Sequence, residues 1–230
     1  MPKSASAAAP PARVWMLPDE PEPVRLTSTI WADTDGIHDD LRTPVDLDEW
    51  LDAVGTDRAA AHATEAELAQ ARALRDAIRR LAAFVTHDRR TAAASAMTDV
   101  AAALDQVNST VAALPAPLLA LRDGRLELSA DGGPSSVTTR LARVAEQAAE
   151  LLGGDDAARL RACYAPGCVL YFIKTHPRRE WCSVACGNRV RAARHYQRIR
   201  EQTARENGAG DPAPADSGSL RAWGPPNDPL

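Results

Sequence analysis

Residues 163–200 read CYAPGCVLYFIKTHPRREWCSVACGNRVRAARHYQRIR and contain all four cysteines of the 230-residue chain. The cysteines are spaced C-x4-C, then thirteen residues, then C-x3-C. Two close cysteine pairs joined by a short loop are typical of a tetrahedral four-thiolate metal site, because the loop brings the two pairs together. A closed set of soft thiolates favours zinc. We therefore predict one structural Zn²⁺ ion, held by Cys163, Cys168, Cys182 and Cys186.

Two other uses of the cysteines stay open. Four cysteines form two disulfides in an oxidising compartment, and four thiolates also hold iron–sulfur clusters. The sequence has no run of 18 apolar residues that would span a membrane, and the short apolar run at residues 7–9 is not a signal peptide. We therefore expect a cytoplasmic protein with no membrane association, and a metal site is the better interpretation in that compartment.

The residues around the cysteines predict a small zinc module. The apolar run 169–173 favours a strand, residues 175–177 a turn, and residues 178–181 a second strand that returns beside the first. A helix is expected from Cys182 to about residue 206, with Cys182 and Cys186 on one face of its first turn. A hairpin followed by a helix that carries the second cysteine pair is a treble-clef-like arrangement.

The predicted helix has a basic side. At about 100° per residue, its arginines fall opposite the two cysteines, so they are expected to point outward. An outward arginine ridge is typical of a nucleic-acid surface, although a solvated face or a docking surface for an acidic protein fits the same pattern. Asn188 and Arg189 are expected beside the zinc site, Arg189 paired with an acid. The candidate DNA-binding residues are Arg178, Arg179, Arg191, Arg194, His195, Arg198 and Arg205, with Lys174 beside them.

Charge is divided unevenly along the chain. Residues 1–156 contain 15 Lys/Arg and 25 Asp/Glu, a net charge of −10, whereas residues 157–206 contain 11 and 3, a net charge of +8. Such a division suggests a basic binding module joined to an acidic partner domain. Simple attraction between the two halves is the alternative.

The tetrapeptide Cys186-Gly187-Asn188-Arg189 resembles the motif that names the CGNR zinc finger family. The preceding segment 179–183 (REWCS) and the basic helix that follows are also similar to that family, as is the segment 159–163 (RLRAC). Many members have one more residue between the last two cysteines than residues 183–185 provide. The resemblance implies a two-domain bacterial protein that acts as a transcription regulator, with an ABATE domain in its N-terminal half.

The N-terminal half is expected to be an α+β domain, mostly helical with a small sheet. Thr43 followed by Pro44 predicts a helix start, and Thr64 with Glu67 forms a capping box. Asp123-Gly124 predicts a two-residue hairpin turn. The expected elements are a strand at 24–31, a loop at 32–40, helices at 43–55, 64–87, about 95–113 and 136–152, a hairpin at 118–128, and a helical lead at 156–162.

These expectations divide the chain into four parts. They are a disordered N-terminal segment at 1–17, an ABATE-like sensor or dimerisation domain at 18–155, a CGNR zinc-finger domain at 156–206, and a disordered tail at 207–230.

The N-terminal domain also contains a candidate effector site. Arg75 and Arg79 lie one helical turn apart and suit a paired anion clamp, with Ser28 and Thr29 nearby and Asn108 on another helix. Where the family usually has a Phe-x-Asn-Thr-like segment, this chain has Leu-Thr-Ser-Thr at 26–29. Structural ion pairs are the alternative use of these arginines, and the alanine-rich helices equally suit a homodimer surface.

No assembled catalytic motif is apparent. The sequence lacks G-x-S-x-G, H-E-x-x-H and a P-loop. His38, His62 and His87 are isolated, and the acidic group beside His38 is a weak metal candidate, as is His176 in the zinc loop. We therefore expect a non-enzymatic DNA-binding regulator that contains zinc. A protein–protein interaction module and an enzyme with a purely structural zinc are the alternatives.

Overall fold

The computed structural model describes residues 15–55, 62–115, 117–130 and 136–208. The sequence predicts disorder at residues 1–17 and 207–230. Of these, residues 1–14 and 209–230 lie outside the described ranges. Within the described part, residues up to Val190 form one compact unit and residues from Arg191 onward a second. Each unit is described by itself.

Two helices begin where their capping residues predict. Helix α2 (Pro44–Val54) is capped by Thr43, and helix α3 (Glu65–Val85) by Thr64. In both, the threonine hydroxyl accepts a hydrogen bond from a backbone N–H three residues later, and a carboxylate there, Asp46 or Glu67, accepts one from the cap backbone. These reciprocal bonds satisfy backbone donors that the helix leaves free, so they fix where each helix begins.

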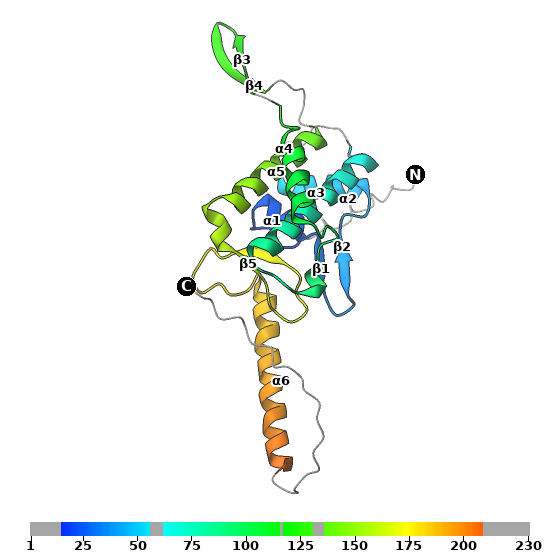
Figure 1. The fold of residues 1–230 in the computed structure, drawn as a ribbon, viewed down its shortest axis with the longest axis vertical. Helices are drawn as coiled ribbons and strands as arrows, with labels where there is room; N and C mark the ends of the chain where they lie inside the picture. Colours follow the sequence, from blue (N-terminus) through cyan, green and yellow to red (C-terminus); the bar gives the residue numbers. More distant parts are fainter. Residues whose placement is uncertain (1–14, 56–61, 116, 131–135, 209–230) are drawn as a thin grey trace, which may run out of the picture. The chain divides into compact units, whose positions relative to one another are not determined.

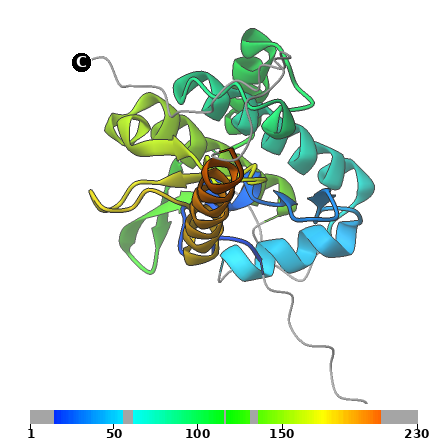
Figure 2. The same ribbon diagram turned by 90° about the horizontal axis from the view of Figure 1, so that it is seen from below.

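The core of the first unit lies between helices. Helices α4 (Val100–Val111) and α5 (Val137–Gly153) pack against α3 and against each other, and they can be followed in two perpendicular views (Figure 1; Figure 2). Many of the facing residues are alanines, which allow the helix backbones to approach closely. The buried cluster includes Leu68, Leu74, Ala77, Leu141, Val144 and Ala148. The predicted helical content and its apolar stripes are confirmed.

The prediction of a strand at residues 24–31 is wrong over most of that range. Residues Glu22–Thr27 form helix α1, and only Ile30–Ala32 is a strand, β1. The hydroxyl groups of Thr27, Ser28 and Thr29 each donate to the carbonyl three residues earlier, at 2.8 Å. These local bonds favour a helical turn over an extended chain.

The expected loop at 32–40 contains half of a hairpin. Strand β1 pairs in antiparallel fashion with β2 (Ile37–Asp39), with Trp31 opposite His38. Gly36 has φ +132°, which glycine adopts readily in a turn. The hairpin predicted around Asp123-Gly124 is confirmed: β3 (Pro117–Arg122) pairs with β4 (Arg125–Ala130), and both turn residues have positive φ.

The metal-binding segment, residues 160–190, has a different hairpin from the one expected. The helical lead is only a 3-10 turn, Asp155–Arg159, followed by strand β5 (Leu160–Ala162). Strand β6 (Tyr171–Ile173) pairs with β5, whereas residues 178–181 form no strand. The bond from Cys163 N–H to Leu170 O, 2.9 Å long, extends this pairing into the first cysteine loop. This bond continues the β5–β6 ladder by one residue on each strand, so the first cysteine loop holds β6 beside β5.

The same hairpin packs on the N-terminal helices. Leu160, Tyr171 and Ile173 share a buried cluster with Val24 of α1 and Leu151 of α5. A short 3-10 turn, Thr91–Ala93, contributes Ala93 to the cluster around the cysteines. Helix α6 then runs Val184–Gly208. The fold is thus a mostly helical α+β arrangement with three two-stranded antiparallel sheets among the described residues, as the sequence predicts in outline.

Candidate functional site

The four cysteine side chains converge in a buried cluster. All four Sγ atoms lie within 4.8 Å of one another; Cys182 Sγ is 3.4 Å from that of Cys186 and 3.8 Å from that of Cys168. A tetrahedral zinc ion with Zn–S bonds of about 2.3 Å places its sulfurs about 3.8 Å apart. The donor set therefore fits one Zn²⁺ ion, and four protein thiolates leave no open position, so the ion is structural.

Local backbone bonds place each ligand. Cys163 follows β5, and Cys168 closes a turn by donating its N–H to Ala165 O at 2.9 Å, with Gly167 at φ +71°. Cys182 precedes α6 and does not open it, which corrects the prediction. Ser183 caps the helix instead, because its hydroxyl accepts the N–H of Cys186 at 3.2 Å.

Arg189 is bound to a zinc ligand. Its guanidinium donates to Cys186 Sγ at 2.9 Å, where the sequence predicted an acid as partner. Hydrogen bonds from the other three thiols, and then from Arg189, hold the pKa of Cys186 below its usual range. A positively charged hydrogen-bond donor such as Arg189 offsets part of the negative charge of four thiolates around a divalent ion. The hydrogen bonds expected of Asn188 in the cysteine loop stay a prediction.

A second arginine, which the sequence did not single out, holds the first cysteine pair. Arg90 Nη1 donates to Cys163 O at 2.5 Å and to Cys168 O at 2.7 Å. The other side of its guanidinium forms a bidentate pair with Asp88, at 2.8 and 2.7 Å. Arg90 follows α3 in sequence, so the N-terminal domain supplies this support.

Two aromatic rings complete the surroundings of Arg90. The guanidinium carbon lies 5.1 Å from the ring centre of Tyr164 and 5.7 Å from that of Tyr171. Tyr171 also donates its hydroxyl to Asp88 Oδ2 at 2.9 Å. Burial raises the pKa of Asp88, but the hydrogen bonds and charge of Arg90 outweigh it, so the net pKa is lowered and the carboxylate stays charged. We refer to Asp88 and Arg90 together as the Asp88–Arg90 clamp.

Arg179 supports the second cysteine pair and was predicted to bind DNA. It donates to Cys182 O at 3.0 Å, to Ile173 O at 2.9 Å and to the buried carboxylate of Glu20 at 2.5 Å. Its guanidinium also lies over the ring of Phe172, 5.0 Å from the centre. These contacts engage both terminal nitrogens of the Arg179 guanidinium, so we remove Arg179 from the candidate DNA interface.

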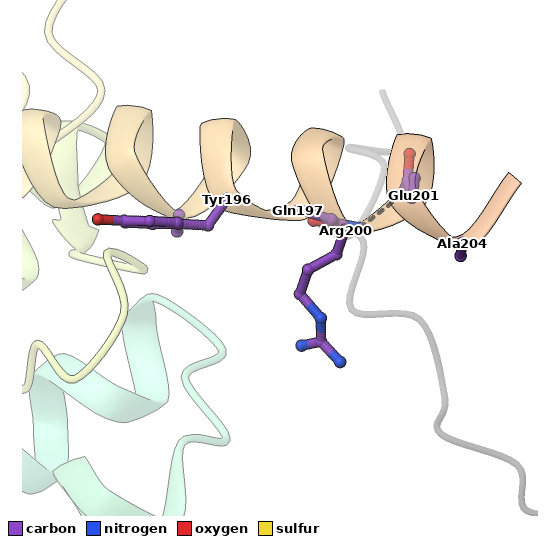
Figure 3. Close-up of a pocket in the computed structure, with 6 residues that line it drawn as sticks. Tyr196, Gln197, Arg200, Glu201 and Ala204 are labelled. Carbon is purple, nitrogen blue, oxygen red and sulfur yellow. Dashed lines mark hydrogen bonds between the residues drawn. The ribbon is translucent and has the colours of Figure 1, made fainter. Parts of the chain in front are cut away.

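The other candidate DNA-binding residues are exposed. Arg191, Arg194, His195, Arg198 and Arg205 all lie on the surface of α6, and Arg178 is exposed in the turn before it. Tyr196, Gln197 and Arg200 line a shallow hollow along the same helix, where Gln197 bonds to Glu201 (Figure 3). All the described residues around this hollow belong to α6, so it is part of the helix surface and not an enclosed site.

Four of the five candidate effector residues are buried. Arg75 forms a bidentate pair with Asp39 at 2.7 and 3.0 Å, and Arg75 Nη1 lies 3.4 Å from Thr29 Oγ1.

The second arginine is also bound by protein groups. Arg79 donates to the carbonyls of Thr27 and Ala93, at 3.0 and 3.1 Å. The Ser28 hydroxyl donates to backbone carbonyls, while Asn108 is exposed on α4. Protein groups therefore occupy both guanidinium groups, and effector binding there stays a prediction.

A cleft of about 660 Å³ lies beside the metal site. Its lining includes Met16, Leu17, Trp31 and Asp33 from the N-terminal part of the chain, and Cys186 and Arg189 from α6. The buried indole N–H of Trp31 has no hydrogen-bond partner in the described part of the chain. Sequence reasoning did not find this cleft, because the segments that form it are more than 130 residues apart.

His38, His62 and His176 have hydrogen-bond partners within the chain. His38 stacks on Trp31 with ring centres 4.3 Å apart and bonds to Asp33 at 2.8 Å, and His62 bonds to Asp48 at 3.0 Å. His176 accepts the N–H of Arg178 at 3.1 Å within its turn. Among the described residues, the four cysteines are the one group of three or more His, Cys, Asp or Glu side chains that converge closely enough for a metal.

No membrane-spanning segment is found among the described helices, since none of them combines the length and the apolar composition that a lipid bilayer requires.

The closed thiolate set predicts one zinc ion per chain. Replacing Cys182 by alanine removes one of four ligands, and we expect zinc to be lost together with structure in residues 160–190, because this segment has little apolar core of its own. Metal analysis and hydrogen exchange measure the two effects. Thr175→Ala, an exposed position in the same loop, should keep zinc. Iron with acid-labile sulfide, or a disulfide between these cysteines, would contradict the assignment.

The Asp88–Arg90 clamp predicts that zinc retention depends on the N-terminal domain. Arg90→Ala removes the bonds to the carbonyls of Cys163 and Cys168, and we expect zinc affinity to fall about 10–100-fold, the usual effect of removing groups that orient metal ligands. Competition with a chromophoric chelator measures it. The control is Arg89→Ala, which removes the neighbouring, exposed arginine. Equal zinc affinity in the two variants would exclude a role for the clamp in holding the metal.

Comparison with known protein families agrees with this geometry. Residues 21–155 match the ABATE model, described as "Putative stress-induced transcription regulator", and residues 159–199 match the CGNR zinc finger model. No curated protein matches the chain. The ABATE match covers more than half of the chain. The CGNR match spans the four cysteines and the first part of α6. The chain therefore belongs to the ABATE family and carries a C-terminal CGNR zinc finger.

Proposed function

We propose that the protein is a zinc-dependent DNA-binding transcription regulator and that α6 is its DNA-contacting element. The observation that carries the proposal is the arginine-rich, exposed surface of a helix whose first turn bears a zinc ligand. Between Arg191 and Arg205 the helix has five arginines and one acid, Glu201. Arginine side chains on a helix neutralise phosphates and also reach guanine edges in the major groove.

The zinc ion has an indirect part in this function. It fixes Cys186, and Val190 one turn later is buried in the same cluster, so the start of α6 is held. The proposed contact residues are Arg191, Arg194, His195, Arg198 and Arg205, with Arg178 from the preceding turn. The N-terminal domain is proposed to act in the cytoplasm as a non-catalytic sensor or dimerisation domain. Turnover of a metabolite by the purified protein would contradict that part of the proposal.

Salt dependence tests the DNA interface. If about four to six phosphates are contacted, the logarithm of the binding constant should fall with the logarithm of salt concentration with a slope of about −4 to −5. Replacing Arg194 and Arg198 together by alanine should weaken binding and reduce the slope by about 2, because two phosphate contacts are lost. Binding to genomic fragments across a salt series measures both quantities.

The matched control is the Arg89→Ala, Arg143→Ala variant. It makes the same change in net charge at two exposed arginines of the N-terminal domain, so a general electrostatic effect would appear in both double variants. Unchanged affinity in the α6 variant, with zinc bound, would remove this helix from the interface. If the wild-type protein has no affinity for DNA, the basic surface is better explained as a docking site for an acidic protein.

A further inference from the structure

The β3–β4 hairpin presents an apolar face to solvent. Its register places Leu119 opposite Leu128 and Leu121 opposite Leu126. Because side chains alternate between the two faces of a strand, these four leucines share one face. They are 68%, 77%, 69% and 69% exposed, respectively. We call this the four-leucine face.

The opposite face is polar toward the turn. Ala120 lies opposite Glu127, and Arg122 lies opposite Arg125. Alternation of apolar and polar residues, which β4 shows from Arg125 to Leu128 and β3 lacks at Leu118 and Ala120, is the pattern of a sheet that has one face packed and one face in water. An isolated two-stranded hairpin is marginally stable in water, and burying a leucine side chain fully contributes about 1.5–3 kcal/mol. The hairpin therefore has the pattern of a covered sheet, but none of the residues that the structure describes covers its apolar face.

We propose that the four-leucine face is a homodimer interface, in which the hairpins of two copies pack face to face around a two-fold axis. Full burial of a leucine contributes about 1.5–3 kcal/mol, which at about 25 cal/mol per Å² corresponds to about 60–120 Å² of apolar surface per side chain, so the face offers at most roughly 400 Å² per copy. That is within the size of apolar patches that mark interaction sites, about 300–600 Å². Two such faces bury at most roughly 800 Å² of apolar surface, which is below the usual 1,200–2,000 Å² of stable interfaces, so the proposed dimer is a weak one.

The face is complementary to a copy of itself. Its two cross-strand pairs are both leucine to leucine, so a rotated copy meets the same two-by-two arrangement, as an isologous interface requires. Charge also permits the approach. Residues 1–156 have a net charge of −10, but the hairpin itself carries Arg122, Arg125, Asp123 and Glu127, which sum to zero. The hairpins themselves therefore add no net repulsion to the approach of two copies.

This interface does not depend on the DNA-binding proposal. It uses residues of the N-terminal domain, and none of the α6 arginines takes part. Its tests therefore need no DNA, and failure of either proposal leaves the other standing.

Sedimentation equilibrium of the full-length, zinc-loaded protein measures the association. We expect a dimer for the wild type. Replacing Leu119 and Leu128 together by serine removes one cross-strand pair from each copy, four leucines per dimer, and should raise the dissociation constant at least about 100-fold. The control is Leu118→Ser, an exposed leucine on the opposite face of β3. A monomeric wild type at 100 μM, or equal dissociation constants for the variant and the control, would overturn the proposal.

Cross-linking tests the geometry without depending on hairpin stability. A Leu126→Cys variant places a thiol on the four-leucine face, and a short bismaleimide should link two copies of the zinc-loaded protein through it. Glu127→Cys places the thiol on the opposite face and should not be linked. Equal cross-linking of both variants, or none of the first, would show that the copies do not meet through this face.

Discussion

Convergence of four thiolates on one metal ion is the constraint on which the C-terminal part of the structure depends. Strands β5 and β6 have three residues each, and the cysteine loops between them and α6 are too short to enclose a separate core. Four thiolates within 4.8 Å repel one another unless a cation lies between them. The metal therefore supplies both the charge balance and the cross-link that this segment needs to fold.

Each cysteine pair is also held by an arginine with its own carboxylate. Arg90 with Asp88 binds the carbonyls of Cys163 and Cys168, and Arg179 with Glu20 binds the carbonyl of Cys182. Both carboxylates come from the N-terminal domain, as does Arg90. A buried charge without its partner is costly, so the Glu20–Arg179 ion pair, together with the bonds from Arg90 to the carbonyls of Cys163 and Cys168, makes folding of the domain and closure of the metal site mutually dependent. The zinc finger up to Val190 is accordingly part of one compact unit with that domain.

The accuracy of the sequence predictions follows the range of the interactions. The helix starts at Thr43 and Thr64, the Asp123-Gly124 turn and the four-cysteine site depend on residues close in sequence, and these features were predicted. The capping box of Thr43 with Asp46 was not. The strand at 24–31 was wrong because the apolar alternation covered few residues, while hydroxyl-to-carbonyl bonds favoured a helical turn. The partner of Arg179, Glu20, is 159 residues away. No pattern along the chain distinguishes such an arginine from an exposed one.

The distinction between structural and exposed arginines also changes how the charge division is interpreted. Residues 157–206 have a formal charge of +8, but several of their cations are bound within the chain. Arg179 and Arg189 belong to the metal site, and Arg159 pairs with Asp156 at 2.7 Å. The positive charge that remains for a polyanion is therefore concentrated on α6 beyond Val190 and on the turn at Lys174 and Arg178. The proposed DNA-binding surface thus consists of arginines that the metal site leaves exposed, and the net charge of residues 157–206 alone overestimates its positive charge.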